Sequence, residues 1–221
     1  MNEPISDNFK KKRIYNDYIK RILDIFAALP ILVLGAIPMG IAAAAIRIES
    51  PGCAIFRQKR LGRNGKEFEI LKFRSMYINS EHTGSGVYSN RDDSRVTKVG
   101  KIIRSTSIDE LPQLINILKG EMSFIGPRPP LTYHPWPIEE YTDEQRRMFE
   151  VRPGITGWAQ IHGRKQVEWN ERIRLNVWYV DHVSFWLDVK IFFKTIMAVV
   201  TRKDNENVGA TLKEETAEAV K

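Results

Sequence analysis

The sequence predicts an α+β protein that is mostly helical, and three observations lead to that class. An uncharged apolar run covers residues 25–46, which is long enough for a membrane helix. An Asn64-Gly65 pair, which is typical of a hairpin turn, lies in a region of alternating apolar and polar residues. Helical periodicity follows at residues 110–119 and again at 168–202. We therefore predict a re-entrant membrane helix-break-helix, a small β-hairpin and a compact domain with interfacial amphipathic helices.

Charge and cysteine content narrow the class of protein. The 221-residue chain has a net charge of +7 and a single cysteine, Cys53, which excludes an internal disulfide and is typical of a reducing compartment. The positive charge indicates an anionic partner such as a nucleotide, a phospholipid surface or a nucleic acid. The basic residues cluster near apolar segments and do not alternate with stacking aromatics along a sheet, which argues against nucleic acid.

Basic residues flank the apolar run on both sides. Lys10–Arg13 and Lys20-Arg21 precede it, and five cations between Arg47 and Arg63 follow it. Positive charge stays on the cytoplasmic side of a membrane, so both flanks prefer the same side. The run also contains Pro30 and Pro38, and an interior proline kinks a helix. We predict that the helix enters the bilayer, breaks near Pro38 and returns; the alternative is an ordinary spanning helix.

Changes in composition set the predicted boundaries. Residues 1–20 form a basic N-terminal segment, 21–48 the membrane hairpin, 49–203 a cytoplasmic domain, and 204–221 a charged, disordered tail. The spacing of Thr142 and Gln145 predicts a capping box and a short helix to about Glu150.

Two adjacent carboxylates, Asp109 and Glu110, stand at the start of one helical pattern. Pro112 lacks an N–H and fits only the first turn, so we predict Asp109 as the N-cap; a Ser107–Glu110 capping box would place Pro112 one residue too deep. Gly120 is the predicted stop. The predicted apolar face consists of Leu111, Leu114, Ile115 and Leu118.

Arginines flank this helix start. Arg104 lies just upstream, and the stiff turn at residues 126–130 is predicted to project the side chain of Arg128 away from the backbone. A helix N-terminus flanked by arginines is an anion site, and phosphate is the usual anion. Carboxylates beside a phosphate site suggest Mg²⁺, a nucleophile, or both. The alternative is that Asp109 is only an N-cap and Glu110 only a first-turn acid.

Seven segments, in this order, resemble the bacterial polyprenyl-phosphate phosphoglycosyl transferases of the small monotopic type, also called initiating sugar transferases. They are Lys20–Asp24, Phe56–Gly62, Leu71–Met76, Arg104–Gln113, Gly126–Pro129, Val151–Gln160 and Tyr179–Asp188. The resemblance implies transfer of a sugar 1-phosphate from a UDP-sugar to undecaprenyl phosphate, with release of UMP. It also implies a cytoplasmic catalytic domain on the bacterial inner membrane and a re-entrant hairpin, although the family usually carries Ser-Pro where this chain has Ile37-Pro38.

The resemblance and the residue chemistry together predict roles at the carboxylate pair. Asp109 would be the nucleophile that forms an aspartyl-phosphosugar intermediate. Glu110, with Asp109, would hold Mg²⁺ on the diphosphate. Arg104 and Arg128 would clamp phosphates.

Four further basic residues are predicted substrate contacts. The resemblance places Lys72 and Arg74, at the end of the hairpin, in the nucleotide-phosphate site; solvated strand-edge charges are the alternative. Arg152 and Arg164 are predicted phosphate or uridine contacts, or else structural pair-formers.

The C-terminal helical stretch combines aromatic residues with a lysine stripe, Lys190 and Lys194. It is typical of a membrane-interfacial helix, and a core helix is the alternative. Asp188 lies among apolar residues and is therefore predicted to be paired.

Two other functions fit the same residues. One is a membrane-associated nucleotide-sugar pyrophosphohydrolase, and the other is a non-catalytic basic membrane scaffold. No motif in the sequence predicts which sugar is transferred. The sequence also leaves the oligomeric state open, with a homodimer as one outcome.

Overall fold

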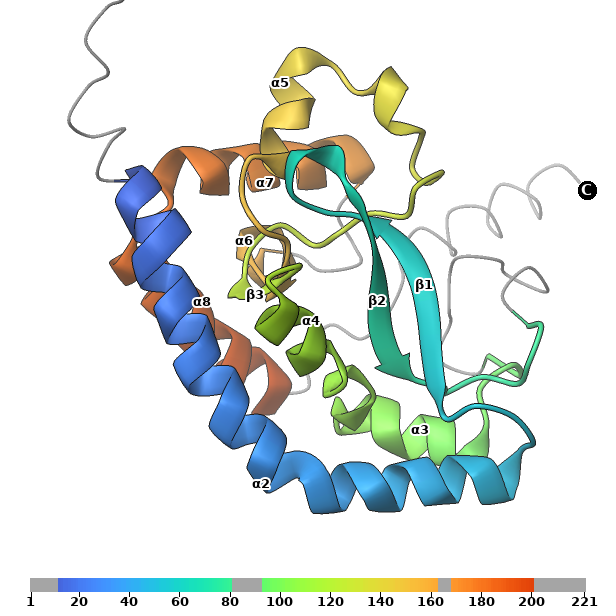
Figure 1. Ribbon diagram of the computed structural model, residues 1–221. Coiled ribbons are helices and arrows are strands. Elements are labelled where there is room, and N and C mark those ends of the chain that lie inside the picture. The colour runs from blue at the N-terminus through green and yellow to red at the C-terminus, as the bar shows by residue number, and fades with distance from the viewer. Residues whose placement is uncertain (1–11, 81–92, 163–167, 201–221) are drawn as a thin grey trace, which may run out of the picture.

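A long N-terminal helix runs down the left side of the fold and then along its lower edge (Figure 1). The structure, a computed structural model, describes residues 12–80, 93–162 and 168–200; the predicted tail, Arg164 and the first 11 residues of the basic segment lie outside these ranges. A π-helical turn at Tyr15–Ile19 leads into α2, Lys20–Glu49. Within the described ranges, the continuous helical segment Lys12–Glu49 alone is long and apolar enough to cross a membrane.

The helix α2 contains Pro30 and Pro38 and bends partway along its length (Figure 1). Each proline lacks the N–H that an interior residue donates, which weakens the helix locally and permits a bend. The helix nevertheless remains continuous from Lys20 to Glu49. The predicted helix-break-helix is therefore one bent helix in this structure.

The predicted β-hairpin is present. Strands β1, Ile55–Leu61, and β2, Glu67–Phe73, pair antiparallel from Ile55–Phe73 to Leu61–Glu67. Asn64 and Gly65 adopt positive φ values of 58° and 71°, as their sequence predicts. The connection spans residues 62–66, however, and includes a 3₁₀ turn, so the predicted two-residue turn is too short.

The segment that carries the carboxylate pair differs from the prediction. Helix α3, Lys98–Ser105, is followed by a 3₁₀ turn at Ile108–Glu110 and by α4, Gln113–Lys119. Asp109 is not an N-cap: Ser107 adopts a left-handed conformation before the 3₁₀ turn, and α4 begins only after Pro112. Gly120 ends α4 at a φ of 85°, as predicted. The later start also changes the buried face, which includes Leu114 and Ile117 and leaves Ile115 exposed.

A second small sheet joins two distant segments. Strand β3, Ser123–Ile125, pairs in parallel with β4, Gly154–Thr156. A Cβ atom on Gly154 would lie 2.1 Å from the backbone nitrogen of Gly126, so glycine is required for this approach. The sheet holds the start of the turn that carries Arg128, because Gly126 N donates to Thr156 O at 2.8 Å and Gly154 N donates to Pro127 O at 2.9 Å.

Helices complete the fold. A 3₁₀ turn at Ile138–Glu140 precedes α5, Asp143–Arg146, which opens with the predicted Thr142–Gln145 capping box and continues into a 3₁₀ turn at Arg147–Phe149. The remaining helices are α6, Trp158–Ile161, α7, Trp169–His182, and α8, Phe185–Val200. The predicted C-terminal helical stretch is thus two helices.

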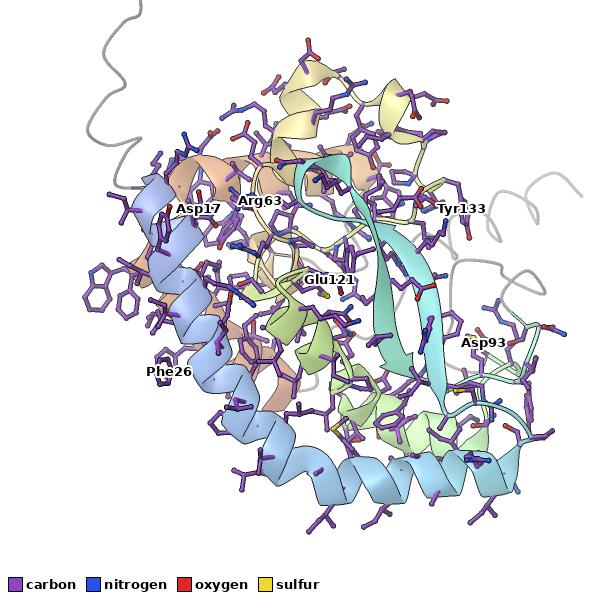
Figure 2. The ribbon with its side chains drawn as sticks, viewed as in Figure 1. Asp17, Phe26, Arg63, Asp93, Glu121 and Tyr133 are labelled. Atoms are coloured by element: carbon purple, nitrogen blue, oxygen red, sulfur yellow. The ribbon has the colours of Figure 1, made fainter. Side chains whose placement is uncertain are left out.

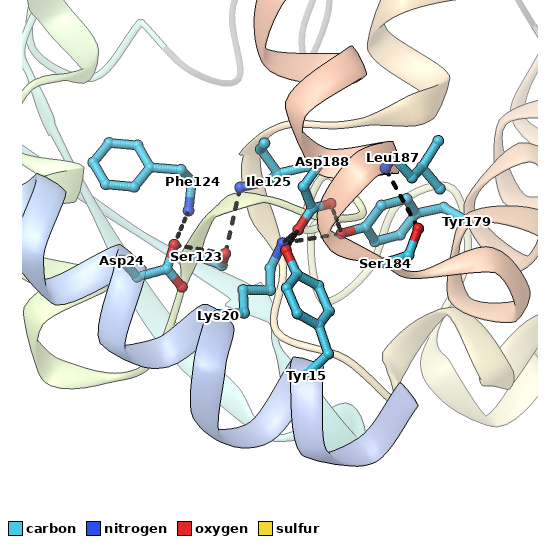
Figure 3. Close-up of polar contacts among 10 residues, drawn as sticks. All are labelled: Tyr15, Lys20, Asp24, Ser123, Phe124, Ile125, Tyr179, Ser184, Leu187 and Asp188. Atoms are coloured by element: carbon cyan, nitrogen blue, oxygen red, sulfur yellow. Dashed lines mark hydrogen bonds and ion pairs between the residues drawn. The ribbon is translucent and has the colours of Figure 1, made fainter. Parts of the chain in front are cut away.

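A buried polar network ties the N-terminal helix to this frame (Figure 3). Asp188 of α8 accepts hydrogen bonds from Tyr15 and Tyr179, both at 2.7 Å, and forms a buried ion pair with Lys20. The prediction that Asp188 is paired is confirmed. Four residues after Lys20, Asp24 accepts hydrogen bonds from the Ser123 hydroxyl at 3.0 Å and from the Phe124 N–H at 3.2 Å. The two carboxylates therefore fix α2 against α7, α8 and β3.

Candidate active site

The carboxylate pair lies on a turn that is anchored on both sides. Ile108, just before Asp109, packs against a core cluster that includes Ile46 of α2. Leu111, just after Glu110, packs against a second cluster that includes Ala28 of the same helix. The two apolar side chains hold the turn against α2, so that the acids lie beside the long apolar helix.

Asn116 brings the hairpin to the same place. This fully buried residue of α4 accepts a hydrogen bond from Leu71 N at 3.0 Å and donates one to Glu69 O at 2.7 Å. The amide therefore replaces a missing strand partner along β2. The next residue of β2, Lys72, is thereby placed next to Glu110.

Glu110 is held by two cations. Its Oε1 atom lies 3.1 Å from Nζ of Lys72 and 3.6 Å from a terminal nitrogen of Arg128. Burial opposes ionisation of Glu110, but the two cations outweigh it and lower the pKa of this carboxyl to about 2. Glu110 is thus a carboxylate throughout the physiological pH range.

Asp109 has the opposite electrostatic character. Burial and the neighbouring negative charge of Glu110 raise the pKa of Asp109 to about 6, against the opposing effects of Lys72, Arg104 and Arg128. Two adjacent carboxyls whose pKa values are driven apart are typical of groups with different chemical tasks. An ionised Asp109 is the more basic oxygen nucleophile of the two.

Arg104 is positioned by the hairpin. Its Nε atom donates to the hydroxyl of Ser75 at 2.7 Å, and Asp109 acts electrostatically on its guanidinium. Burial lowers the pKa of Arg104, with the charge of Asp109 acting in the opposite direction. Burial likewise lowers the pKa of Lys72, against the effect of Glu110.

The structure brings together five of the predicted site residues: Lys72, Arg104, Asp109, Glu110 and Arg128. It places two others elsewhere. Arg74 is buried and donates to the carbonyl oxygens of Ser50 and Pro51, at the C-terminal end of α2. Arg152 donates to Gly120 O at 3.1 Å, at the far end of α4 from the carboxylates. Both arginines stabilise helix C-termini in this structure.

Two residues that support the site were not predicted from the sequence. Ser75 orients Arg104, and Asn116 docks α4 on the hairpin. Ser75 lies in the Leu71–Met76 segment and Asn116 just after Arg104–Gln113, but a serine or an asparagine carries no local sign of its distant partner. Only the contacts between elements identify them.

The donor set fits a divalent cation. No group of three or more histidine, cysteine or acidic side chains gathers in the described parts of the chain. Mg²⁺ in phosphate chemistry needs only one or two carboxylates, because water and substrate phosphates supply its remaining ligands. Asp109 and Glu110 meet that requirement.

Comparison with known proteins gives a consistent result. Residues 15–202 match the family described as bacterial sugar transferase. The chain is 42% identical over 182 residues to the uncharacterized sugar transferase EpsL of Bacillus subtilis, covering 82% of this chain and 87% of that protein. It is 42% identical over 195 residues to the UDP-glucose:undecaprenyl-phosphate glucose-1-phosphate transferase of Caulobacter vibrioides, covering 86% and 72% of the two chains.

A third relative is longer. The UDP-N-acetylgalactosamine-undecaprenyl-phosphate N-acetylgalactosaminephosphotransferase of Aeromonas hydrophila is 43% identical over 187 residues, which cover 83% of this chain and 44% of that protein. The family match and the coverage of the first two relatives show that this chain belongs to the bacterial sugar transferase family and is a sugar-phosphate transferase.

Proposed function

We propose that this protein transfers a sugar 1-phosphate from a UDP-sugar to undecaprenyl phosphate and releases UMP, through a covalent intermediate on Asp109. The observation that carries the proposal is the pair of adjacent carboxylates with opposite pKa shifts, set among Lys72, Arg104 and Arg128. The printed activities of the relatives support the substrate classes.

The reaction has two displacement steps. An oxygen of Asp109 attacks the phosphorus that bears the sugar, and the bond from that phosphorus to the bridging oxygen breaks, so that UMP leaves. A phosphate oxygen of undecaprenyl phosphate then attacks the same phosphorus. The bond to Asp109 breaks, the carboxylate is regenerated, and the sugar diphosphate lipid leaves. No net proton transfer to Asp109 is required.

The surrounding cations provide charge neutralisation, which is the main requirement of phosphoryl transfer. Arg104 and Arg128 bind phosphate oxygens of the donor. Lys72 keeps Glu110 ionised and in place. Bound Mg²⁺, held by Glu110 and Asp109, would neutralise charge on the diphosphate.

Membrane placement explains how the lipid reaches the site. The side chain of Phe26 on α2 is 75% exposed and points away from the fold (Figure 2), and Leu34 and Ile37 are similarly exposed. We propose that the bent α2 is a re-entrant helix and that α8 lies at the interface, on the cytoplasmic face of the inner membrane. The turn that bears Asp109 packs on α2, so this membrane placement would bring the turn to the depth of a lipid phosphate.

Product analysis tests the proposed function. Purified full-length protein is given Mg²⁺ and each of a panel of UDP-sugars, with and without undecaprenyl phosphate. We expect UMP together with a sugar diphosphate lipid for at least one sugar. UMP and free sugar phosphate with no lipid product would identify a hydrolase instead. Anion binding without turnover of any donor would identify a scaffold.

A further inference from the structure

Two lysines of α8 converge on one aromatic ring. The Nζ atoms of Lys190 and Lys194 lie 5.8 Å and 6.0 Å from the ring centroid of Trp158. Both side chains are exposed, and no carboxylate pairs with either within residues 12–80, 93–162 and 168–200. Like charges four residues apart on a helix repel each other, so a bound anion would relieve both.

Trp158 is held in place by a column of rings. Its indole stacks on Trp178 with centroids 4.4 Å apart and an interplanar angle of 21°. His162 lies against Trp158 at 3.9 Å, and His182 stacks on Trp178 at 4.1 Å. The column fixes the indole before any ligand arrives, so the two ammonium groups face a preorganised surface.

Exposed apolar side chains lie directly beside the lysines. Successive residues of an α-helix are about 100° apart, which places Lys190 within about 40° of Trp186 and Met197 around the axis of α8. Trp186 is 77% exposed and Met197 is 61% exposed. Ile191, on the other side, is fully buried. The cations therefore mark the edge between the packed face and the exposed apolar face of α8.

We propose that Lys190, Lys194 and Trp158 form a binding site for the phosphate of an anionic phospholipid headgroup, with the acyl chains against the exposed face of α8. The site is built from α6 and α8, and not from the elements that carry Asp109 and Glu110. An anion that sits at the border of an apolar face matches a lipid phosphate, since a soluble phosphate gains nothing from that face. The inference rests on the membrane placement of α8 in the proposed function.

Lipid selectivity in bilayers tests the site. The full-length protein is reconstituted in phosphatidylcholine bilayers, and brominated phosphatidylglycerol or brominated phosphatidylcholine is titrated in while tryptophan fluorescence is recorded. We expect phosphatidylglycerol to quench preferentially. In the Lys190→Gln/Lys194→Gln double variant we expect that preference to fall by roughly fivefold for each lysine removed.

A matched double variant separates a site from general charge. Lys59→Gln/Lys66→Gln removes the same charge from exposed positions on the hairpin, and we expect it to keep the preference. Equal losses in both double variants, or an unchanged preference in Lys190→Gln/Lys194→Gln, would overturn the site. Loss of the wild-type preference on adding inorganic phosphate at constant ionic strength would assign the site to soluble phosphate and overturn the lipid assignment. Turnover of the wild-type protein in neutral detergent tests the proposed function separately.

Discussion

At the residue scale, the central contrast is between two neighbours. Glu110 forms ion pairs with both Lys72 and Arg128, whereas burial and the charge of Glu110 raise the pKa of Asp109. The sequence predicted the five side chains that gather here, and the family resemblance implied different roles for Asp109 and Glu110. Which of the two carboxylates pairs with the cations was not predicted, because no local pattern encodes which carboxylate oxygen faces which cation.

This contrast predicts the pH dependence of the first step. In the proposed mechanism the carboxyl of Asp109 must be ionised to attack, and its pKa is about 6. Because this pKa is raised, the attacking form is present above about pH 6 and is lost as pH falls. The kcat/KM for UMP release should therefore fall about tenfold per pH unit below about pH 6, as read from the free enzyme. Glu110, with a pKa of about 2, remains ionised across that range. A flat profile between about pH 7 and about pH 4.5 would contradict the assignment of Asp109 as the attacking base.

Ser75 is predicted to act through Arg104. Arg104→Ala should lower kcat/KM about ten- to a hundredfold, since a hydrogen bond to a charged group contributes about 1.5–3 kcal/mol. Ser75→Ala should give a smaller loss, because it removes only the acceptor of the Arg104 Nε–H. In an Arg104→Ala background, Ser75→Ala should have no further effect. Ser105→Ala is the control, because Ser105 is exposed and lies on α3, the helix that also carries Arg104. Additive losses would show that Ser75 does not position Arg104.

At the element scale, locally encoded features were predicted and non-local ones were not. The capping box at Thr142 and the positive φ values at Asn64 and Gly65 depend on neighbouring residues only. The parallel pairing of β3 with β4 joins three-residue strands about 30 residues apart, and such short strands carry no periodicity. Arg74 and Arg152 resemble substrate contacts in sequence, yet both bind carbonyl oxygens at helix ends.

The buried pair of Lys20 and Asp188 is predicted to govern stability. Lys20→Met would leave Asp188 as an uncompensated buried charge, although Tyr15 and Tyr179 still donate to it. Removing one partner of a buried pair costs about 3–5 kcal/mol, and we expect a corresponding fall in denaturation midpoint in detergent. Arg13→Met, whose side chain is 70% exposed, is the control and should change little. Equal midpoints for the two variants would show that the network adds nothing to stability.

At the scale of the whole molecule, the proposed function assigns the exposed apolar surfaces of α2 and α8 to the membrane. Composition predicted an apolar helical segment of membrane length, and its prolines predicted an interruption near Pro38. The structure was needed to show that the helix bends but stays continuous, and that it contacts the turn that bears Asp109. Asp17, near the start of the helical segment, also pairs with Arg63 of the hairpin loop at 2.7 Å (Figure 2). The proposed topology places both of these residues on the cytoplasmic face.

A re-entrant α2 predicts that both flanks are cytoplasmic. Arg13→Cys and Lys66→Cys each introduce a single cysteine at an exposed position in a Cys53→Ser background. Both cysteines should be protected from membrane-impermeant thiol reagents in intact cells and labelled after lysis. Pro38→Ala, which restores an interior N–H, should shift the helix toward a spanning topology. Labelling of Arg13→Cys in intact cells, with Lys66→Cys protected, would establish a spanning helix.

The proposed covalent step on Asp109 is tested most directly by intact-protein mass spectrometry. Enzyme is mixed with its UDP-sugar and Mg²⁺ in the absence of lipid and quenched in acid. We expect a stoichiometric burst of UMP and a mass gain equal to one sugar phosphate, on the peptide that contains Asp109. Asp109→Asn should show neither, whereas Glu110→Gln should retain some adduct. Absence of the adduct from active wild-type enzyme, with kinetics that require both substrates bound together, would contradict the two-step mechanism.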